Sequence, residues 1–231
     1  MTKRRAPSRR PGVFRRIAAR ILLFGLSAYL LVAASLISLR WIPPFTTAVQ
    51  IQRRVQSLLE RKPYRKRYEF VRLNRITPDL QHAVIASEDS RFYQHHGFDW
   101  LEIQKAIDDE DEDRPMRGAS TITQQLVKNL YLTTKRSFLR KGIEASLVPV
   151  AEFALGKQRI LELYLNVVEW GPGVFGAEAA AEFHYGVYAS QLSLEQSARL
   201  AAILPNPIRR KPARMSAKAD IILARMRQMG W

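Results

Sequence analysis

The 231-residue sequence contains no cysteine, so it can form neither a disulfide framework nor a thiolate metal site. Alternating polar and apolar residues, the pattern of half-buried strands, are scarce, and no internal repeat is visible. Acidic residues number 21 against 37 basic ones, and the resulting formal charge of +16 indicates an anionic partner. The length and the 47% hydrophobic content suit one core, so we expect one mainly α domain with room for an anchor.

The first forty residues narrow the choice between nucleic acid, an acidic membrane and a phosphate-bearing substrate. An uncharged run from Ile21 to Leu39 is long enough to cross a bilayer core of roughly 30 Å. A basic cluster precedes this run, and Arg40 and Trp41 close it. The sequence therefore predicts a cytoplasmic tail (1–20), a single-pass transmembrane anchor (21–40) in the cytoplasmic (inner) membrane and a periplasmic remainder. Membrane lipids are then partners, and nucleic acid is not.

Two alternatives to the anchor have less support. Ala33-Ala34-Ser35 offers a small-residue cleavage site for a signal peptide, but the apolar run exceeds the usual length of such a segment. A buried core helix is disfavoured because no charge interrupts the run and both of its ends carry cationic or aromatic interface residues.

The sequence beyond Pro43-Pro44 predicts one helical domain over residues 46–231. A basic stretch (53–67) is either a solvated face or a surface close to membrane phosphates. Helix starts are predicted at Thr77, Ser120 and Ser193, each with a capping hydroxyl. A long helical pair is expected from Arg140 to about Val168.

An acidic run at residues 108–113 favours an exposed, mobile loop. A metal site there is the alternative, but the run lacks the spaced ligands and the turn glycine of a calcium loop.

Three polar clusters are the candidates for chemistry. Around Glu88, acids meet aromatics, two imidazoles and a glycine, and an acid beside apolar surface gains a raised pKa suited to a general base. Along the next helix, Thr121, Gln125 and Lys128 form one polar stripe that suits sugar hydroxyls and a phosphate. Arg140 and Glu144 share a helix face. For Glu88 the alternative is a helix cap or a surface acid, and for the polar stripe it is a solvated helix face. For Arg140 and Glu144 it is an ordinary surface ion pair.

Read together, these clusters resemble the family 51 glycosyltransferases, which polymerise peptidoglycan. The matching motifs are Glu88-Asp89-x-x-Phe92-x-x-His95-x-Gly97, Gly118-x-Ser120-Thr121-x-Thr123-Gln124-Gln125-x-x-Lys128, Arg140-Lys141-x-x-Glu144 and Lys157-x-x-Ile160-Leu161-Glu162-x-Tyr164-Leu165-Asn166. Four ordered motifs over roughly residues 65–212 are far more specific than any one of them. No Ser-x-x-Lys occurs, so the transpeptidase module of the bifunctional relatives is not expected, and the chain is similar to the monofunctional members.

The resemblance implies a lysozyme-like helical glycosyltransferase domain behind one transmembrane helix. It implies that Glu88 and Glu144 are catalytic, that Glu144 holds a divalent metal (Mg or Mn) or nearby cations, and that no organic cofactor is used. The substrate-binding residues that it implies are Asp89, Phe92, His95, Thr121, Gln125, Lys128, Asn129, Arg140, Lys141, Tyr164 and Asn166. The implied partners are lipid II, the growing lipid-linked glycan strand and other proteins of cell-wall synthesis or division.

The implied reaction is an inverting transfer. Glu88 deprotonates the 4-hydroxyl of the acceptor, which attacks the anomeric carbon of the growing chain and releases undecaprenyl pyrophosphate. Two rivals are a lytic muramidase, because the fold and one glutamate would also suit cleavage, and a non-catalytic anchored scaffold. Pro149 lies inside an expected long helix, where we expect a proline to introduce a kink. Pro149 and the acidic run both depart from the family pattern, which bears on rate and lipid preference.

Overall fold

The computed structural model describes residues 13–108, 120–135 and 137–231. The chain divides into two compact units, one up to Ser35 and one from Leu36 to Trp231. Most of the acidic run 108–113, as well as Gly118 of the second motif, lies outside the described residues.

The N-terminal unit consists of most of helix α1, Val13–Ser38, whose apolar side chains are largely exposed. Its 26 residues span about 39 Å, more than the hydrocarbon core of a bilayer. Within the described ranges it is the one helix long and apolar enough to cross a membrane. The helix begins before the predicted anchor and includes Arg15, Arg16 and Arg20, whose long side chains can reach an interface while the helix continues.

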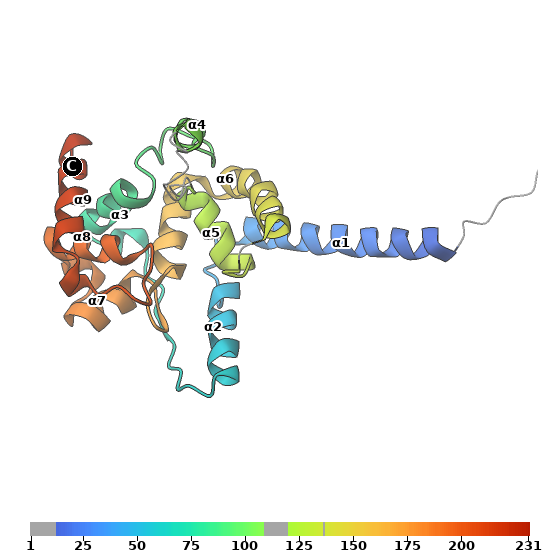
Figure 1. The fold of residues 1–231 in the computed structure, drawn as a ribbon, viewed down its shortest axis with the longest axis horizontal. Coiled ribbons are helices and arrows are strands. Elements are labelled where there is room, and N and C mark those ends of the chain that lie inside the picture. Colours follow the sequence, from blue (N-terminus) through green and yellow to red (C-terminus); the bar gives the residue numbers. More distant parts are fainter. Residues whose placement is uncertain (1–12, 109–119, 136) are drawn as a thin grey trace, which may run out of the picture. The chain divides into compact units, whose positions relative to one another are not determined.

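The second unit is mostly helical, as predicted (Figure 1). Its α-helices are α2 (Ala48–Leu59), α3 (Pro78–Glu88), α4 (Trp100–Asp108), α5 (Ile122–Tyr131), α6 (Phe138–Val167), α7 (Ala177–Tyr185), α8 (Leu194–Ile203) and α9 (Ser216–Gln228). Short 3-10 helices are η1 (Leu73–Arg75), η2 (Ala189–Gln191) and η3 (Pro212–Arg214). Three short strands, β1 (Arg67–Tyr68), β2 (Glu169–Gly171) and β3 (Val174–Phe175), form a sheet in the order β1-β3-β2. β3 runs parallel to β1 and antiparallel to β2.

The predicted helix starts are partly confirmed. Ser193 caps α8 in a capping box with Gln196, as predicted. The cap of α5 is Thr121, not Ser120, because the Thr121 side chain accepts from the backbone N–H of Gln124. Thr77 precedes α3, but its hydroxyl makes no capping bond, so that part of the prediction is wrong.

Helix α6 is a pair of helices, as predicted, but the break is not at Pro149. The non-helical residue is Gly156, with φ 71° and ψ 162°, a backbone conformation that favours glycine. Pro149 is exposed and remains within the first helix of the pair.

Two groups of helices make up the core and position the site. α5 packs along α6, while α3 packs against α8 and α9 (Figure 1). Arg225 of α9 donates to the carbonyl oxygen of Ala86 at 2.7 Å, near the end of α3. The Trp231 ring stacks on His82 of α3, with centroids 4.2 Å apart. The C-terminal segment therefore holds the helix that ends at Glu88.

Candidate active site

Glu88 is the last residue of α3 and is half-buried. The Gln125 side-chain Nε2 donates to Glu88 Oε2 at 2.9 Å, and the Ser87 hydroxyl lies 3.5 Å from Oε1. Burial raises the pKa of Glu88 above that of an ordinary glutamate, while the Gln125 hydrogen bond and the charges of Lys128 and Arg210 oppose the rise. The carboxyl group thus has the environment of a general base that works near neutral pH.

The amide of Gln125 is held in one orientation from the other side. The hydroxyl of Tyr164, a fully buried residue of α6, donates to Gln125 Oε1 at 2.9 Å. Burial raises the pKa of Tyr164 well above its usual value, so the phenol keeps its proton and remains a donor. With its oxygen occupied, the amide must present its N–H to Glu88.

Glu144 has a very different environment in the first half of α6. Its side chain is buried, with 2% of the residue exposed. Arg140 Nη1 lies 2.7 Å from one carboxylate oxygen, and Lys141 Nζ lies 2.5 Å from the other. The Arg140 Nε is also buried and has no hydrogen-bond partner within the described residues. Glu144 is therefore a buried carboxylate between a largely buried Arg140 and a half-exposed Lys141, and not half of the surface ion pair that the spacing alone suggests.

Lys128 of α5 links the two acids electrostatically. Burial lowers the pKa of Lys128, and the Glu144 carboxylate is the largest influence that raises it again, with a smaller contribution from Glu88. The nearby charges of Arg140 and Lys141 act in the opposite direction. The structure therefore brings residues of the first three motifs into one electrostatic centre.

Other predicted site residues make hydrogen bonds that hold the elements of this centre together. His95 Nδ1 accepts from the backbone N–H of Gly97 at 3.1 Å, so Nε2 carries the proton and donates to Asp89 Oδ1 at 2.9 Å. Asp89 Oδ2 accepts from the N–H of Ile122, and the Thr121 hydroxyl donates to the Gly97 carbonyl at 2.7 Å. These bonds fasten the end of α3 to the start of α5.

Gly97 itself is required by a close approach. Its φ is +93°, and a Cβ there would lie 2.4 Å from Cγ1 of Val148 on α6. The glycine of the first motif therefore lets the loop after α3 contact α6.

Three more predicted residues have their contacts inside the protein. Phe92 is fully buried, with the Lys157 ammonium 4.6 Å from its ring centroid. Asn129 donates to the carbonyl of Gln125, and the Asn166 side chain pairs with both backbone groups of Val71. Because these contacts are made within the protein, we interpret the three residues as positioning groups.

The residues around Glu144 do not fit the expected divalent metal. Both carboxylate oxygens already accept from cations, and Lys128 adds a third positive charge, whereas Mg or Mn needs several free oxygen ligands. The proximity of Asp89, His95 and Asp99 makes them the other group to consider. Both His95 nitrogens and both Asp89 oxygens are in hydrogen bonds, and Asp99 accepts from the N–H of Glu102, so this cluster is explained without a metal.

Sequence reasoning missed Arg210, whose charge acts on Glu88. Arg210 lies outside the four motifs, in the loop after α8, and Nη1 donates to the carbonyl of Ala202 at 3.1 Å. The signal was available in the basic run of residues 209–211, which follows the segment Pro205-Asn206-Pro207-Ile208. The run gave no hint that it folds back toward α3.

Comparisons with known proteins match the part of the chain that contains this centre. The Transglycosylase family model matches residues 53–227. The biosynthetic peptidoglycan transglycosylase of Pseudomonas putida (strain GB-1) is 44% identical over 224 residues, which cover 95% of this chain and 93% of the relative. The protein of the same description from Pseudomonas aeruginosa is 42% identical over 219 residues, with 95% and 93% covered. The matched region contains all the site residues named above, Arg210 included.

Proposed function

The chain belongs to the transglycosylase family and is a peptidoglycan glycosyltransferase of cell-wall synthesis, and from this premise we propose that Glu88 is its general base. The observation that carries the proposal is the pair of bonds from Tyr164 to Gln125 and from Gln125 to Glu88. A half-buried carboxylate held by a neutral donor keeps a raised pKa and can accept a proton, whereas one held by cations cannot do so readily.

The reaction begins at the acceptor saccharide of lipid II. Its 4-hydroxyl loses a proton to a Glu88 oxygen as the hydroxyl oxygen bonds to the anomeric carbon of the growing strand. The bond from that carbon to the pyrophosphate oxygen breaks, and its electron pair leaves with undecaprenyl pyrophosphate. One displacement of this kind inverts the anomeric configuration. Glu88 then returns its proton to solvent.

The departing pyrophosphate requires positive charge on the side opposite the base. Arg140, Lys141 and Lys128 supply it, and Glu144 keeps the first two in place through its two ion pairs. The unpaired Nε of Arg140 is a further donor close to that cluster. In this proposal the three cations stabilise the leaving group, and Glu144 holds cations, which is the other of the two roles that the resemblance implies for it.

The anchor follows from the substrates. Both sugar donors and acceptors are lipid-linked, and α1 is compatible with a single-pass membrane anchor. We place residues 1–20 in the cytoplasm because basic residues flanking a membrane helix favour that side. The catalytic domain is then periplasmic, at the outer face of the inner membrane.

The test is a gel assay of the full chain with fluorescent lipid II, run beside Glu88→Gln. We expect a ladder of glycan products from the wild type and a rate about 10³-fold lower from the variant, because a general base contributes on that scale. The assay is run with and without a divalent cation and a chelator.

Three outcomes decide between readings. A ladder that survives chelation supports charge stabilisation by the three cations. Loss of the ladder on chelation would instead support a role for a divalent metal in the reaction. Cleavage of preformed glycan in place of polymerisation would contradict the proposal and would identify the protein as a lytic muramidase. Unchanged polymerisation by Glu88→Gln would remove Glu88 from the role of base.

A further inference from the structure

Helix α2 carries an apolar stripe on the side that faces away from the rest of the domain. Ile51, Val55, Leu58 and Leu59 recur at helical spacing, and between 46% and 79% of each residue is exposed. Val49, on the opposite side of the helix, is buried. Four exposed apolar side chains on one face of a helix indicate a surface that another body covers.

The other side of α2 is fixed to the domain. Arg53 Nε lies 2.8 Å from Oε2 of the buried Glu169 on β2. The side chain of Gln52 exchanges two hydrogen bonds with Thr134, at 2.7 and 2.8 Å. Figure 1 shows the C-terminal end of α2 pointing away from the other helices of the second unit. The stripe is therefore held in one orientation and does not fold back onto the domain.

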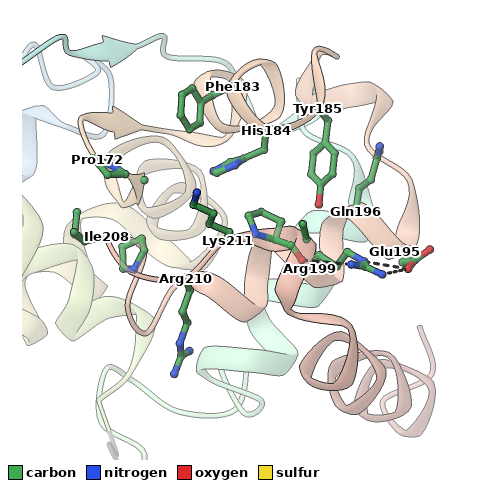
Figure 2. A pocket seen from close by; sticks show the side chains of 14 residues that line it. Pro172, Phe183, His184, Tyr185, Glu195, Gln196, Arg199, Ile208, Arg210 and Lys211 are labelled. Carbon is green, nitrogen blue, oxygen red and sulfur yellow. Dashed lines mark hydrogen bonds and ion pairs between the residues drawn. The ribbon is translucent and has the colours of Figure 1, made fainter.

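The stripe is not part of the cavity shown in Figure 2. That cavity, of about 760 Å³, is formed by the β2–β3 turn, the end of α7, the start of α8 and residues 207–213, and no residue of α2 lines it. A recessed cavity of this size suits a small ligand. The outer face of a single helix is convex, so it suits a partner that covers it from outside.

The position of α2 along the chain limits what that partner can be. α1 ends at Ser38 and α2 begins at Ala48, and the residues between them can span at most about 35 Å. The link is shorter than this limit, because the Pro44 carbonyl accepts from the Tyr68 hydroxyl at 2.8 Å. If α1 crosses a bilayer, α2 stays close to the surface at which α1 leaves it.

The charges beside the stripe are positive. The sequence of α2 contains no acidic residue. Arg54, Arg61 and Arg65 are exposed and make no ion pair within the described ranges. An apolar face bordered by arginines is typical of a helix that lies in the headgroup region of an anionic membrane. A second copy of the chain would bring the same cations against one another, which disfavours it as the partner.

We propose that the apolar stripe of α2 lies in the headgroup region of the membrane that α1 spans, with Arg54 and Arg61 facing the phosphates of anionic phospholipids. The inference rests on the proposed function only for the placement of α1 as an anchor. A second membrane contact fixes the tilt of the domain against the bilayer that holds its lipid-linked substrates. Of the two interpretations that the sequence leaves open for residues 53–67, this inference selects the surface close to membrane phosphates.

The test uses the absence of cysteine from the chain. Ile51→Cys and Ile208→Cys each give the full chain one labelling site, and the two isoleucines are 54% and 42% exposed. Ile208 is the matched control because it lines the cavity of Figure 2 and not α2. Each variant carries a bimane label in vesicles of phosphatidylethanolamine and phosphatidylglycerol. We expect doxyl-labelled phospholipid to quench the emission at residue 51, which also shifts to shorter wavelength, and to leave the emission at residue 208 unchanged.

A second measurement connects the contact to the reaction. Leu58→Glu puts a negative charge into the stripe, and we expect it to raise the KM for lipid II in vesicles several-fold while kcat stays unchanged. The difference should disappear in detergent, where no bilayer surface is present. Ile221→Glu, at an exposed position of α9, makes the same kind of change outside α2 and should leave the KM unchanged.

The outcomes separate this inference from the proposed function. Equal quenching at residues 51 and 208, or none at residue 51, overturns the membrane contact even when the wild type polymerises normally. A shift at residue 51 that grows with protein concentration and is not quenched by doxyl lipid identifies a second copy as the partner, and the inference is then wrong. Absence of polymer from the wild type overturns the proposed function, while quenching is still measurable.

Discussion

Glu88, the last residue of α3, and Glu144, in the first half of α6, are the same type of side chain in opposite surroundings. Glu88 is half-buried and meets a neutral amide and a hydroxyl, whereas Glu144 is buried between two cations. The first arrangement leaves a carboxyl able to take up a proton, and the second uses the carboxylate to hold positive charge in place. Identity of residue type therefore says little about role until the neighbours are known.

The largest contrast is expected in stability. Glu144→Gln leaves Arg140 and Lys141 beside a neutral amide, and we expect it to lower the free energy of unfolding by about 3 kcal/mol, as for a broken buried ion pair. Glu88→Gln replaces a desolvated carboxyl with an amide, and its effect should stay within about 0.5 kcal/mol. Denaturant unfolding of the two variants in the same detergent measures both. Equal losses would contradict the division of roles.

A smaller effect should appear in the pH dependence of the reaction. Burial raises the pKa of Glu88, and Gln125→Leu removes the hydrogen bond that opposes the rise. The acid limb of the rate profile should therefore move to higher pH, with a rate at neutral pH about tenfold lower, since a unit of pKa is tenfold in the ionised fraction. Initial rates from pH 5 to 9 test this. Gln52→Leu, which removes an amide that bonds to Thr134 and not to Glu88, is the control.

The free energy of unfolding should also depend on the protonation of Glu88, but it should fall over the pH range in which the reaction rate rises. Because the pKa of Glu88 is raised in the folded state, the protonated form favours folding, and this contribution is complete below the pKa of the unfolded chain. It is lost as the pH rises through the folded pKa, which is the range where activity grows. The stability difference between wild type and Glu88→Gln, followed across that range, measures the loss. A difference that does not change with pH would contradict the raised pKa.

The smallest effect is expected from Tyr164→Phe. The variant removes the donor that fixes the Gln125 amide, leaves Gln125 Oε1 without its partner and should destabilise the fold by about 1 kcal/mol. The rate should fall only a few-fold, because the amide can still donate to Glu88 in part of the population. A loss as large as that of Gln125→Leu would mean that orientation, more than the donor itself, sets the pKa of Glu88.

Much of this site was predictable from local patterns. The spacing of Arg140, Lys141 and Glu144 places them on neighbouring helix positions, and Ser193 with Gln196 identifies the start of α8. These features depend on residues a few positions apart, where helical geometry fixes the answer.

The remainder depends on partners far along the chain. Ser120 and Thr121 are both capping residues, and Thr121 caps because its hydroxyl also reaches Gly97. Gly156, not Pro149, interrupts α6, since a proline can remain exposed within a helix while a positive φ favours glycine. Strands of two or three residues leave no alternating pattern to detect. The effect of the Arg210 charge on Glu88 depends on tertiary structure, which no local pattern contains.

The contacts that hold α3 also bear on the order in which the enzyme becomes active. Glu88 lies early in the domain, whereas Arg225 and Trp231, which hold α3, are synthesised more than a hundred residues later. Until α8 and α9 have emerged from the ribosome and folded onto α3, Glu88 remains in water with the proton affinity of an ordinary glutamate. A nascent chain with its motifs already translated is therefore not yet a polymerase, and catalysis starts only when the late helices dock.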